Sequence, residues 1–220
     1  MDPTLEYDAI ILSGGRGSRL GGTAKGALVI EGRSLLTRAL EATRYAAQRV
    51  VVGDGPVPDG VRLTREQPAY AGPAAAVAAG LAALNEALSD SLPDALPTLA
   101  RSRWTLVLAC DIPQAADGIP LLVEAVSAAT ARSLPTRAQS SGTAGKLPDG
   151  WCLIDSQQRL QWLFGLYRTE ALEQAVRVLG DPADSSMRRL LGSLRLQPVP
   201  APAHVFADIN TPEELSRWTR

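Results

Sequence analysis

An apolar run that ends in a glycine-rich loop is the feature of this sequence that most restricts its fold. Residues 7–12 read YDAIIL, a short β-branched and apolar segment that is typical of a buried parallel strand. Residues 13–26 follow with several glycines among polar residues, and glycine allows the backbone to approach a ligand closely. A buried strand followed by such a loop brings backbone N–H groups close to phosphate oxygens. The sequence therefore predicts a phosphate-binding loop after the first strand.

Two well-known phosphate loops do not fit this segment. A Walker-type loop needs its lysine soon after the first glycine, and Lys25 comes too late for that spacing. The dinucleotide fingerprint G-x-G-x-x-G also fails, because Leu20 stands where the third glycine is required. The remaining alternative is an ordinary glycine-rich turn. That alternative does not account for Arg16 and Arg19, which add fixed positive charge, or for the compact ammonium of Lys25.

Lysine is rare in this chain. The 22 basic residues include only two lysines, Lys25 and Lys146. A chain that uses arginine almost everywhere else and keeps a lysine in the glycine-rich loop indicates a local need for an ammonium group.

Strand-like and helix-like segments alternate along the chain, which predicts an α/β fold with a mostly parallel sheet and helices on both faces. Further strands are predicted at residues 49–52, 61–64 and 104–109, and a hairpin at 151–155 and 160–167. Helices are predicted at residues 34–47, 72–88, 118–131, 169–179 and 185–194, and a capping box at residues 211–214. We expect a single domain over residues 1–220, with a surface insertion at 89–103 and a loop at 132–150.

A carboxylate follows the apolar strand predicted at residues 104–109. Asp111 stands at its carboxyl end, which is where open α/β sheets bind ligands. Two interpretations remain open at this point: a ligand that holds Mg²⁺ on phosphate oxygens, or a turn cap of the Asp-x-Pro type. The phosphate loop favours the metal ligand. The neighbouring Cys110 is expected to be a small buried hydrophobic residue rather than a nucleophile.

Composition argues against several other classes of protein. The formal net charge is −1, whereas a nucleic-acid-binding protein usually shows a strongly basic face. Two cysteines are too few for a disulfide framework or a zinc site, and the single histidine, His204, gives little support to a Ser-His-Asp triad. No basic leader or long apolar segment is evident at the start, and no run reaches the roughly 18 apolar residues of a membrane span. We expect a cytoplasmic protein with neither a nucleic acid nor a membrane as its partner.

The segment from residue 12 to residue 36, LSGGRGSRLGGTAKGALVIEGRSLL, resembles the pattern L-A-G-G-x-x-x-R-M-G-x-D-K-x-L of MobA-like nucleotidyltransferases. This family includes molybdenum cofactor guanylyltransferases and their cytidylyltransferase relatives. The resemblance implies a three-layer Rossmann-like nucleotidyltransferase fold, with Arg19 and Lys25 on the triphosphate and the leaving pyrophosphate. It also implies that the phosphates are cradled by the backbone of Leu12, Ser13, Gly14 and Gly15.

The chain departs from the family pattern within this loop. Ser13 replaces alanine, Leu20 replaces methionine, and residues 21–24 (GGTA) stand where the family has Gly-x-Asp. The loss of an aspartate at Ala24 removes an expected partner of Lys25 or of the loop.

Two further segments resemble family motifs around the nucleotide. Residues 110–113 (CDIP) are similar to C-D-x-P, which implies that Asp111 is catalytic and holds both Mg²⁺ and the nucleotide. Residues 65–73 (REQPAYAGP) are similar to an acidic residue followed by G-P-L-A-G, which implies that Glu66 and Gly72 help to read the base or the ribose. The alternative for Glu66 is a solvated loop carboxylate. Gly53 stands where guanylyltransferases often carry asparagine, which weakens the case for guanine.

Two matches lie in the last third of the chain. Residues 206–215 (FADINTPEEL) resemble the closing D/N-x-D/N-T-P-E-D-L of the family, which implies Asp208 or Asn210 as a second metal ligand. Residues 165–168 (GLYR) resemble its x-L-Y-R segment near the acceptor side.

The resemblance implies a Mg²⁺-dependent nucleotidyltransferase. The expected reaction moves GMP from GTP onto the phosphate of molybdopterin and releases pyrophosphate. The alternatives are the same chemistry with CTP, a different phosphorylated acceptor such as a sugar phosphate or phospholactate, and a catalytically idle nucleotide-binding protein. The sequence does not decide the base, the acceptor or the oligomeric state.

Overall fold

One seven-stranded sheet forms the centre of the molecule, in the order β5-β4-β1-β6-β8-β7-β9. The structure is a computed structural model that describes residues 5–14, 25–89, 101–133, 147–207 and 218. Its strands are β1 (Asp8–Ser13), β4 (Arg49–Gly53), β5 (Val61–Thr64), β6 (Trp104–Ala109), β7 (Gly150–Ile154), β8 (Leu160–Arg168) and β9 (Leu196–Pro200). Parallel pairing joins β5, β4, β1 and β6, and β7 with β9, whereas β8 runs antiparallel between β6 and β7. The predicted mostly parallel sheet is confirmed.

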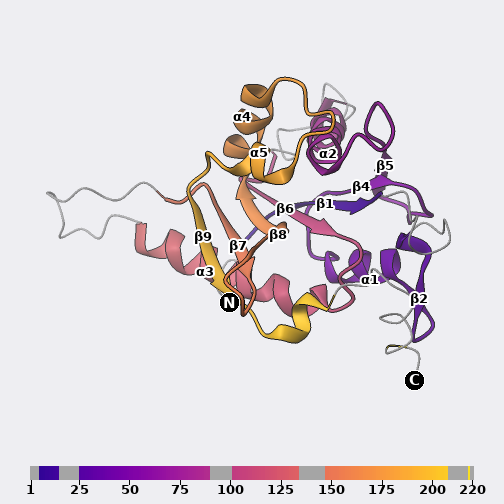
Figure 1. Cartoon of the computed structure of the whole chain (residues 1–220), viewed down its shortest axis with the longest axis horizontal. Helices are drawn as coiled ribbons and strands as arrows, with labels where there is room; N and C mark the ends of the chain where they lie inside the picture. Colours follow the sequence, from indigo (N-terminus) through magenta and orange to yellow (C-terminus); the bar gives the residue numbers. More distant parts are fainter. Residues whose placement is uncertain (1–4, 15–24, 90–100, 134–146, 208–217, 219–220) are drawn as a thin grey trace, which may run out of the picture.

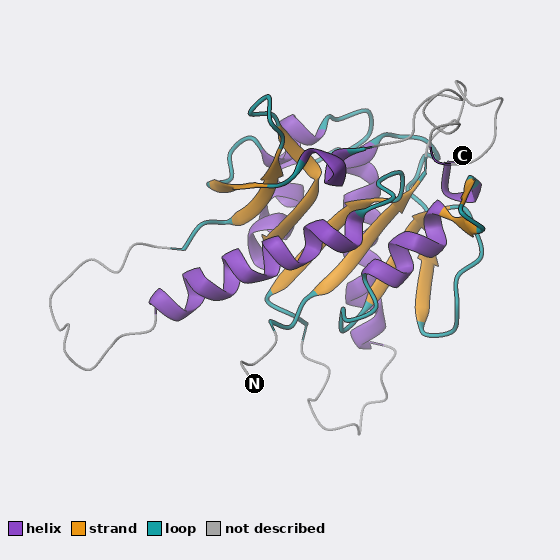
Figure 2. Ribbon diagram, turned by 90° about the horizontal axis from the view of Figure 1, so that it is seen from below, coloured by secondary structure: helices purple, strands orange, loops and turns teal. Residues whose placement is uncertain are grey.

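Helices cover both faces of this sheet (Figure 1). They are α1 (Leu35–Ala42), α2 (Pro73–Ser89), α3 (Ala115–Ser133), α4 (Thr169–Leu179) and α5 (Met187–Leu191). In Figure 1, α2, α4 and α5 lie above the sheet and α1 and α3 below it, and Figure 2 shows the lower layer crossing the strands. The three-layer α/β architecture is therefore the one expected from the alternation of segments.

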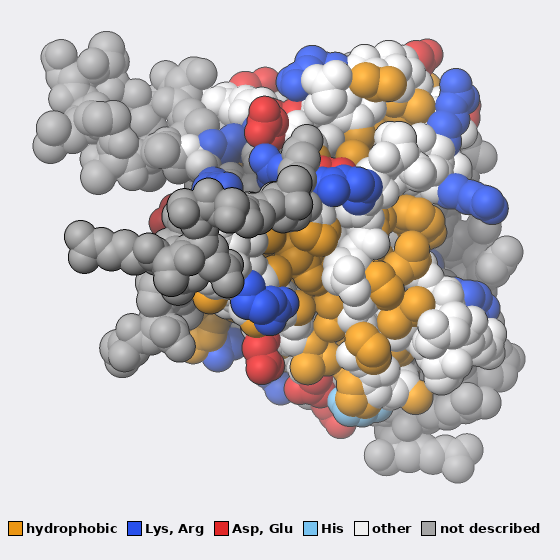
Figure 3. All heavy atoms as spheres, turned by 90° about the vertical axis from the view of Figure 1, so that its left-hand side faces the viewer, with side chains coloured by type: hydrophobic (Ala, Val, Ile, Leu, Met, Phe, Trp, Pro, Cys, Tyr) orange, Lys and Arg blue, Asp and Glu red, His pale blue; other side chains and the backbone are white. Residues whose placement is uncertain are grey.

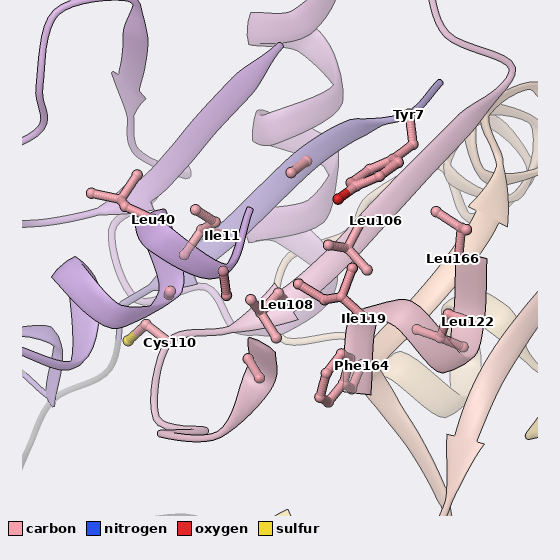
Figure 4. Packing of buried hydrophobic residues seen from close by; sticks show 14 of the residues in the cluster. Tyr7, Ile11, Leu40, Leu106, Leu108, Cys110, Ile119, Leu122, Phe164 and Leu166 are labelled. Carbon is pink, nitrogen blue, oxygen red and sulfur yellow. The ribbon is translucent and has the colours of Figure 1, made fainter. Parts of the chain in front are cut away.

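The alternation of side chains along β1 supplies both hydrophobic cores. Ile11 points to the lower core, where it joins Leu108, Ile119 and Phe164 (Figure 4). Ile10, its neighbour, belongs to the upper core between the sheet and α2, α4 and α5. Successive side chains of a strand point to opposite faces, so a run that is buried at every position must lie between two helical layers.

Two predicted helices are shorter in the structure. The helix predicted at residues 34–47 begins after the N-cap Ser34 as expected but ends at Ala42. The Thr43 hydroxyl donates hydrogen bonds to the carbonyls of Ala39 and Leu40, and the chain then turns toward β4. The helix predicted at 185–194 is reduced to α5, which is capped by Ser186.

Several elements were not predicted. A small hairpin joins β2 (Val29–Ile30) to β3 (Arg33–Ser34), and short 3₁₀ turns form η2 (Lys25–Ala27) and η3 (Ala203–Phe206). The strand β9 reads LQPVP, and its two prolines conceal it in the sequence because proline weakens a strand prediction. It lies at the edge of the sheet, where fewer backbone donors are needed.

Figure 3 views the molecule from the side on which β9 lies, and hydrophobic side chains occupy the middle of this face with charged ones around them. In the part of the chain that the structure describes, no helix has the length and apolar character needed to cross a membrane. The predicted capping box at residues 211–214 lies outside the described residues, as does most of the loop expected at 132–150.

Candidate active site

The phosphate loop begins where β1 comes very close to β4. Ser13 is paired with Gly53 in the sheet, and Gly53 has a φ of +132°. A Cβ atom at position 53 would lie 2.6 Å from the Gly14 nitrogen and 2.6 Å from the Ser13 carbonyl carbon, closer than real Cβ atoms come. Glycine is therefore required here by the backbone of the loop. This gives a physical reason for the absence of the asparagine that guanylyltransferases often carry.

The Ser13 side chain connects three segments at the end of β1. It is buried, and its hydroxyl donates a hydrogen bond of 3.0 Å to the Asp54 carbonyl after β4. A Cβ atom at Gly26 would lie only 2.3 Å from the same hydroxyl, so η2 packs directly against Ser13. The far end of the loop is thus held beside its beginning, and this contact sets the position of Lys25.

Lys25 and Asp111 form an ion pair. The Lys25 ammonium lies 2.8 Å from Asp111 Oδ2, and 25% and 19% of the two side chains are exposed. The strands β1 and β6 are neighbours in the sheet, so their carboxyl ends bring these residues together although 86 positions separate them in the chain. In the family pattern, an aspartate at position 24 is an expected partner of the lysine, but this chain has Ala24. Asp111 is a partner of Lys25 instead.

The adjacent Cys110 is not a nucleophile. Its backbone N–H donates to the Leu12 carbonyl at 3.0 Å, which continues the pairing of β6 with β1. Burial, and then the charge of Asp111, raise the pKa of the Cys110 thiol to about 12. Since the thiolate is the reactive form, Cys110 acts as a buried packing residue, as expected.

Glu66 is a buried carboxylate that faces the phosphate loop. Only 6% of the residue is exposed, which excludes the alternative of a solvated loop residue. Its Oε1 atom accepts a hydrogen bond of 3.0 Å from the Tyr70 N–H and lies 3.9 Å from where a Cβ atom of Gly14 would be. Its Oε2 atom is buried and has no hydrogen-bond partner among the described residues. A buried acceptor without a partner is costly, so this atom is suited to a ligand that donates a hydrogen bond.

Asp111 lines a cleft of about 910 Å³. One wall is formed by Gly72 and by the start of α2, and Gly72 adopts a φ of +90°. Another wall comes from Arg159 and the first residues of β8, including Trp162, and Arg188 at the start of α5 also lines the cleft. The predicted residues Gly72 and Asp111 therefore share a cavity with side chains that sequence motifs did not reveal.

Arg159 is held at this cleft by the turn between β7 and β8. The Asp155 carboxylate accepts hydrogen bonds from the N–H groups of Gln157 and Arg159 and lies 2.9 Å from Arg159 Nε. These contacts, led by the Arg159 backbone N–H, lower the pKa of Asp155 below its ordinary value of 3.8. The hairpin predicted at residues 151–155 and 160–167 is confirmed, but the sequence did not reveal that its turn lies at the same cleft as Asp111.

Arg168 does not lie near the cleft. It is paired with Trp104 at the start of β6, whereas Asp111 follows the other end of that strand. At about 3.3 Å per residue, the six residues of β6 place the two ends roughly 17 Å apart. The structure thus separates Arg168 from Asp111, because β8 runs antiparallel and brings its first residues to the cleft instead. The expectation that residues 165–168 lie near the acceptor side stays a prediction.

Some predicted site residues lie outside the described residues. They are Gly15, Arg16, Arg19, Asp208 and Asn210. Their roles in phosphate and metal binding stay predictions.

The donor set at Asp111 fits a magnesium ion that arrives with a triphosphate. Within the described ranges, no group of three or more His, Cys, Asp or Glu side chains could hold a metal. Mg²⁺ typically uses one or two carboxylates together with substrate phosphates, rather than a cage built from protein alone. A single carboxylate that follows the end of β6, paired with Lys25 at the end of the predicted phosphate loop, meets that requirement.

Comparison with known families agrees with this geometry. The profile of the MobA-like NTP transferase domain matches residues 9–199. The chain belongs to this family. It is therefore a nucleotidyltransferase, and the family match spans the phosphate loop, Asp111 and both walls of the cleft. Comparison with curated protein sequences gives no significant match.

Solved structures of the same fold include members of more than one branch. Molybdopterin-guanine dinucleotide biosynthesis protein A from Archaeoglobus fulgidus is 16% identical, with a TM-score of 0.60 over 96% of this chain and 95% of that one. A Mycobacterium tuberculosis protein is 15% identical, with a TM-score of 0.62 over 98% of both chains. The 2-C-methyl-D-erythritol 4-phosphate cytidylyltransferase of Thermus thermophilus is 19% identical, with a TM-score of 0.53 over 95% of both chains. At these identities the likeness shows the nucleotidyltransferase fold.

Proposed function

We propose that this nucleotidyltransferase moves GMP from GTP onto the phosphate of molybdopterin and releases pyrophosphate. The observation that carries the proposal is the Lys25–Asp111 ion pair, which joins the end of the phosphate loop to the mouth of a cleft large enough for an acceptor. The family membership supplies the reaction class. The choice of GTP and molybdopterin rests on the sequence resemblance and on the name of the Archaeoglobus fulgidus neighbour.

In this reaction an oxygen of the acceptor phosphate attacks the α-phosphorus of the triphosphate. A new P–O bond forms at the α-phosphorus while its bond to the bridging oxygen of the β-phosphate breaks, and pyrophosphate carries the electron pair away. A phosphate monoester has a second pKa of about 6, so the attacking oxygen is already anionic at neutral pH. The site therefore needs no general base, and none of its described residues has to remove a proton.

The work left to the protein is positioning and charge neutralisation. We assign the loop backbone from Leu12 to Gly15 to the phosphates, and Lys25 and Arg19 to the negative charge that develops on pyrophosphate. Asp111, with Asp208 or Asn210 as a second ligand, would hold Mg²⁺. When bound there, the ion would neutralise phosphate charge.

Glu66 is proposed to accept a hydrogen bond from the base or the ribose. Its Oε2 atom lacks a partner among the described residues, and its Oε1 atom is fixed by Tyr70 beside Gly14. A carboxylate accepts but does not donate, so it selects N–H or O–H groups of the nucleotide.

A cytoplasmic location is part of the proposal. Both cysteines, Cys110 and Cys152, are free and buried. Free cysteines are usual in reducing compartments, where nucleoside triphosphates are also available.

The experiment that tests the proposal is a pyrophosphate-release screen with each of the four nucleoside triphosphates, with and without molybdopterin. We expect release with GTP only when molybdopterin and Mg²⁺ are both present, and tighter binding of GTP than of CTP or ATP by isothermal titration. Tighter CTP binding would assign the protein to the cytidylyl branch. Turnover with a sugar phosphate or phospholactate would identify that compound, instead of molybdopterin, as the acceptor. Nucleotide binding without any turnover would indicate a catalytically idle nucleotide-binding protein.

The variant Asp111→Asn tests the assigned metal ligand. A bound metal contributes several kcal/mol to the stabilisation of the transition state, so we expect turnover to fall about a hundredfold or more. Circular dichroism should show an unchanged fold. A matched control is Asp117→Asn on α3, since Asp117 is exposed, pairs with His204 and does not line the cleft. Full turnover in Asp111→Asn would remove this residue from the site.

A further inference from the structure

Tyr70 is an exposed aromatic residue held in an unusual backbone conformation beside the phosphate loop. Tyr70 is 45% exposed to solvent. Its φ of +66° lies in the left-handed region, which non-glycine residues seldom adopt. Such conformations persist where surrounding contacts enforce them, and they concentrate at functional sites.

Contacts on both sides fix the backbone of Tyr70. Its N–H donates to Glu66 Oε1, the atom that faces Gly14 of the phosphate loop. The next residue, Ala71, donates to the Pro68 carbonyl and accepts from the N–H of Asp184 at 2.7 Å. Tyr70 therefore stands between the phosphate loop and Gly72, which lines the cleft.

The ring of Tyr70 is supported from one side by a guanidinium. The Arg65 Cζ atom lies 5.4 Å from the ring centroid, and Arg65 also forms an ion pair with Asp54. The Asp54 carbonyl in turn accepts the hydrogen bond from Ser13 at the start of the loop. A chain of direct contacts thus connects the Tyr70 ring to Ser13 at the start of the loop.

We infer that Tyr70 is the platform on which the nucleobase stacks. The inference rests on the proposed binding of the triphosphate at the loop after β1. Every nucleobase has a flat π-face, whichever hydrogen-bonding groups its edge carries. An aromatic side chain can therefore bind any of the bases by stacking. Gly53, at the end of β4, has no side chain with which to contact a base. The Tyr70 ring is therefore the flat side chain that we assign to stacking. Because purines cover more of a ring than pyrimidines, stacking here favours purine nucleotides.

The test separates the base from the phosphates. Isothermal titration with GTP, CTP and inorganic tripolyphosphate is carried out on wild-type protein, Tyr70→Phe and Tyr70→Ala. Tripolyphosphate carries the same phosphate chain without a base. We expect Tyr70→Phe to bind GTP within about twofold of wild type, because stacking needs the ring and not the hydroxyl. Tyr70→Ala should bind GTP about tenfold more weakly or worse, lose less affinity for CTP, and bind tripolyphosphate as wild type does.

Tyr45 provides a matched control. It is 74% exposed, and the Arg44 guanidinium lies 4.2 Å from its ring centroid, so it repeats the arginine–tyrosine pair away from the nucleotide loop. Tyr45→Ala should leave all three affinities unchanged.

The outcomes distinguish the inference from the proposed function. Wild-type protein that binds neither GTP nor tripolyphosphate would contradict the proposed function itself. Wild-type binding of GTP that persists in Tyr70→Ala would overturn only the stacking role. An equal loss of tripolyphosphate binding in Tyr70→Ala would also overturn it, because Tyr70 would then act on the loop through Glu66. In turnover assays, the stacking role predicts a raised KM for GTP with little change in kcat.

Discussion

Lys25 carries the strongest prediction at the level of single residues. Its ammonium is only partly exposed and reaches Asp111 at 2.8 Å, a space that suits a compact cation better than a broad guanidinium. Charge-assisted contacts contribute about 1.5–3 kcal/mol, so Lys25→Ala should lose on the order of ten- to a hundredfold in kcat/KM. Lys25→Arg should be impaired to a smaller degree although it keeps the charge. Steady-state kinetics with GTP and molybdopterin provides the measurement.

Thermal stability should change little in either Lys25 variant, because a loop lysine buries little apolar area. Arg33→Ala is a suitable control, since it removes an exposed ion pair with Glu41 that involves neither Lys25 nor Asp111. If both Lys25 variants keep wild-type kinetics, Lys25 is a solvated loop residue and the assignment of the phosphate loop fails.

A second prediction concerns the contact between Gly26 and Ser13. A methyl group at position 26 would collide with the Ser13 hydroxyl, so Gly26→Ala should lower the free energy of unfolding by about 1–3 kcal/mol and weaken GTP binding. Ser13→Ala should cost less, because it removes one hydrogen bond to Asp54. The double variant should recover most of the loss, as measured by thermal unfolding and titration with GTP. Strict additivity of the two single effects would show that these side chains do not meet.

The sequence revealed which residues carry chemistry better than it revealed how they are arranged. Lys25 and Asp111 were recognisable from their motifs, but their pairing depends on β1 and β6 being neighbours, which no local pattern encodes. The sequence left open whether the Glu66 carboxylate is exposed to solvent, and the structure shows that it is buried. In the sequence, Gly53 stands where guanylyltransferases often carry asparagine. The structure explains the glycine, because a Cβ atom at this position would lie too close to the Gly14 nitrogen. Tyr70 lies inside the segment 65–73, but the resemblance gave it no role, and only its exposure and backbone conformation single it out.

Among the elements, prediction succeeded where hydrophobic periodicity was strong. The strands β1, β4, β5 and β6 and the helices α2 and α4 lie within two residues of their expected bounds. Errors arose where a local polar contact or a proline decided the outcome. Thr43 ends α1 by bonding back to the helix, and the prolines of β9 are tolerated because it is an edge strand.

The packing of α2 against the sheet leads to a prediction at this scale. A Cβ atom at Gly80 would lie 2.5 Å from Ile10 Cγ2, so the helix backbone rests on the β1 side chains. Alanine favours a helix over glycine by about 1 kcal/mol, yet Gly80→Ala should destabilise the protein by about 1–3 kcal/mol because it overpacks the core. Chemical denaturation measures the difference.

An exposed position on the same helix gives the control for Gly80. Ala82→Gly lies on the outer face of α2 and should lose about 1 kcal/mol from helix propensity alone. A higher stability of Gly80→Ala than of wild type would mean that α2 stands farther from the sheet than the structure places it.

For the whole molecule, two carboxylates act in opposite directions on stability as the pH changes. Burial raises the pKa of Asp8 above its ordinary value of 3.8, although hydrogen bonds from Ser102 oppose the shift. The contribution of Asp8 to stability is thus complete below its unfolded pKa and is lost as the pH rises through the raised value. Asp155 has a lowered pKa, so its contribution is present above the ordinary value and is lost as the pH falls.

Asp8→Asn should therefore raise the melting temperature near neutral pH. The amide keeps an oxygen for the Ser102 N–H and removes the cost of a buried charge. The advantage should shrink as the pH falls toward the ordinary carboxyl pKa of 3.8, because the raised pKa of Asp8 favours the neutral carboxyl in the folded protein. Melting curves at both pH values, with the exposed Asp59→Asn as a control, check this. A constant difference at all pH values would show that the charge of Asp8 is not its cause.

The reversed direction of β8 has a consequence for how this architecture can diversify. A parallel neighbour of β6 would need a long crossover connection. The hairpin of β7 and β8 instead places Arg159 and Trp162 in the wall of the cleft through the short turn at residues 155–159. Turns of this kind accept insertions and substitutions easily. A longer or differently charged turn would remodel that wall while the neighbours of Ser13, Lys25 and Asp111 stay in place. Under the proposed function, the two sides of the cleft are therefore separable modules, and new acceptors could be explored without rebuilding the side assigned to the triphosphate.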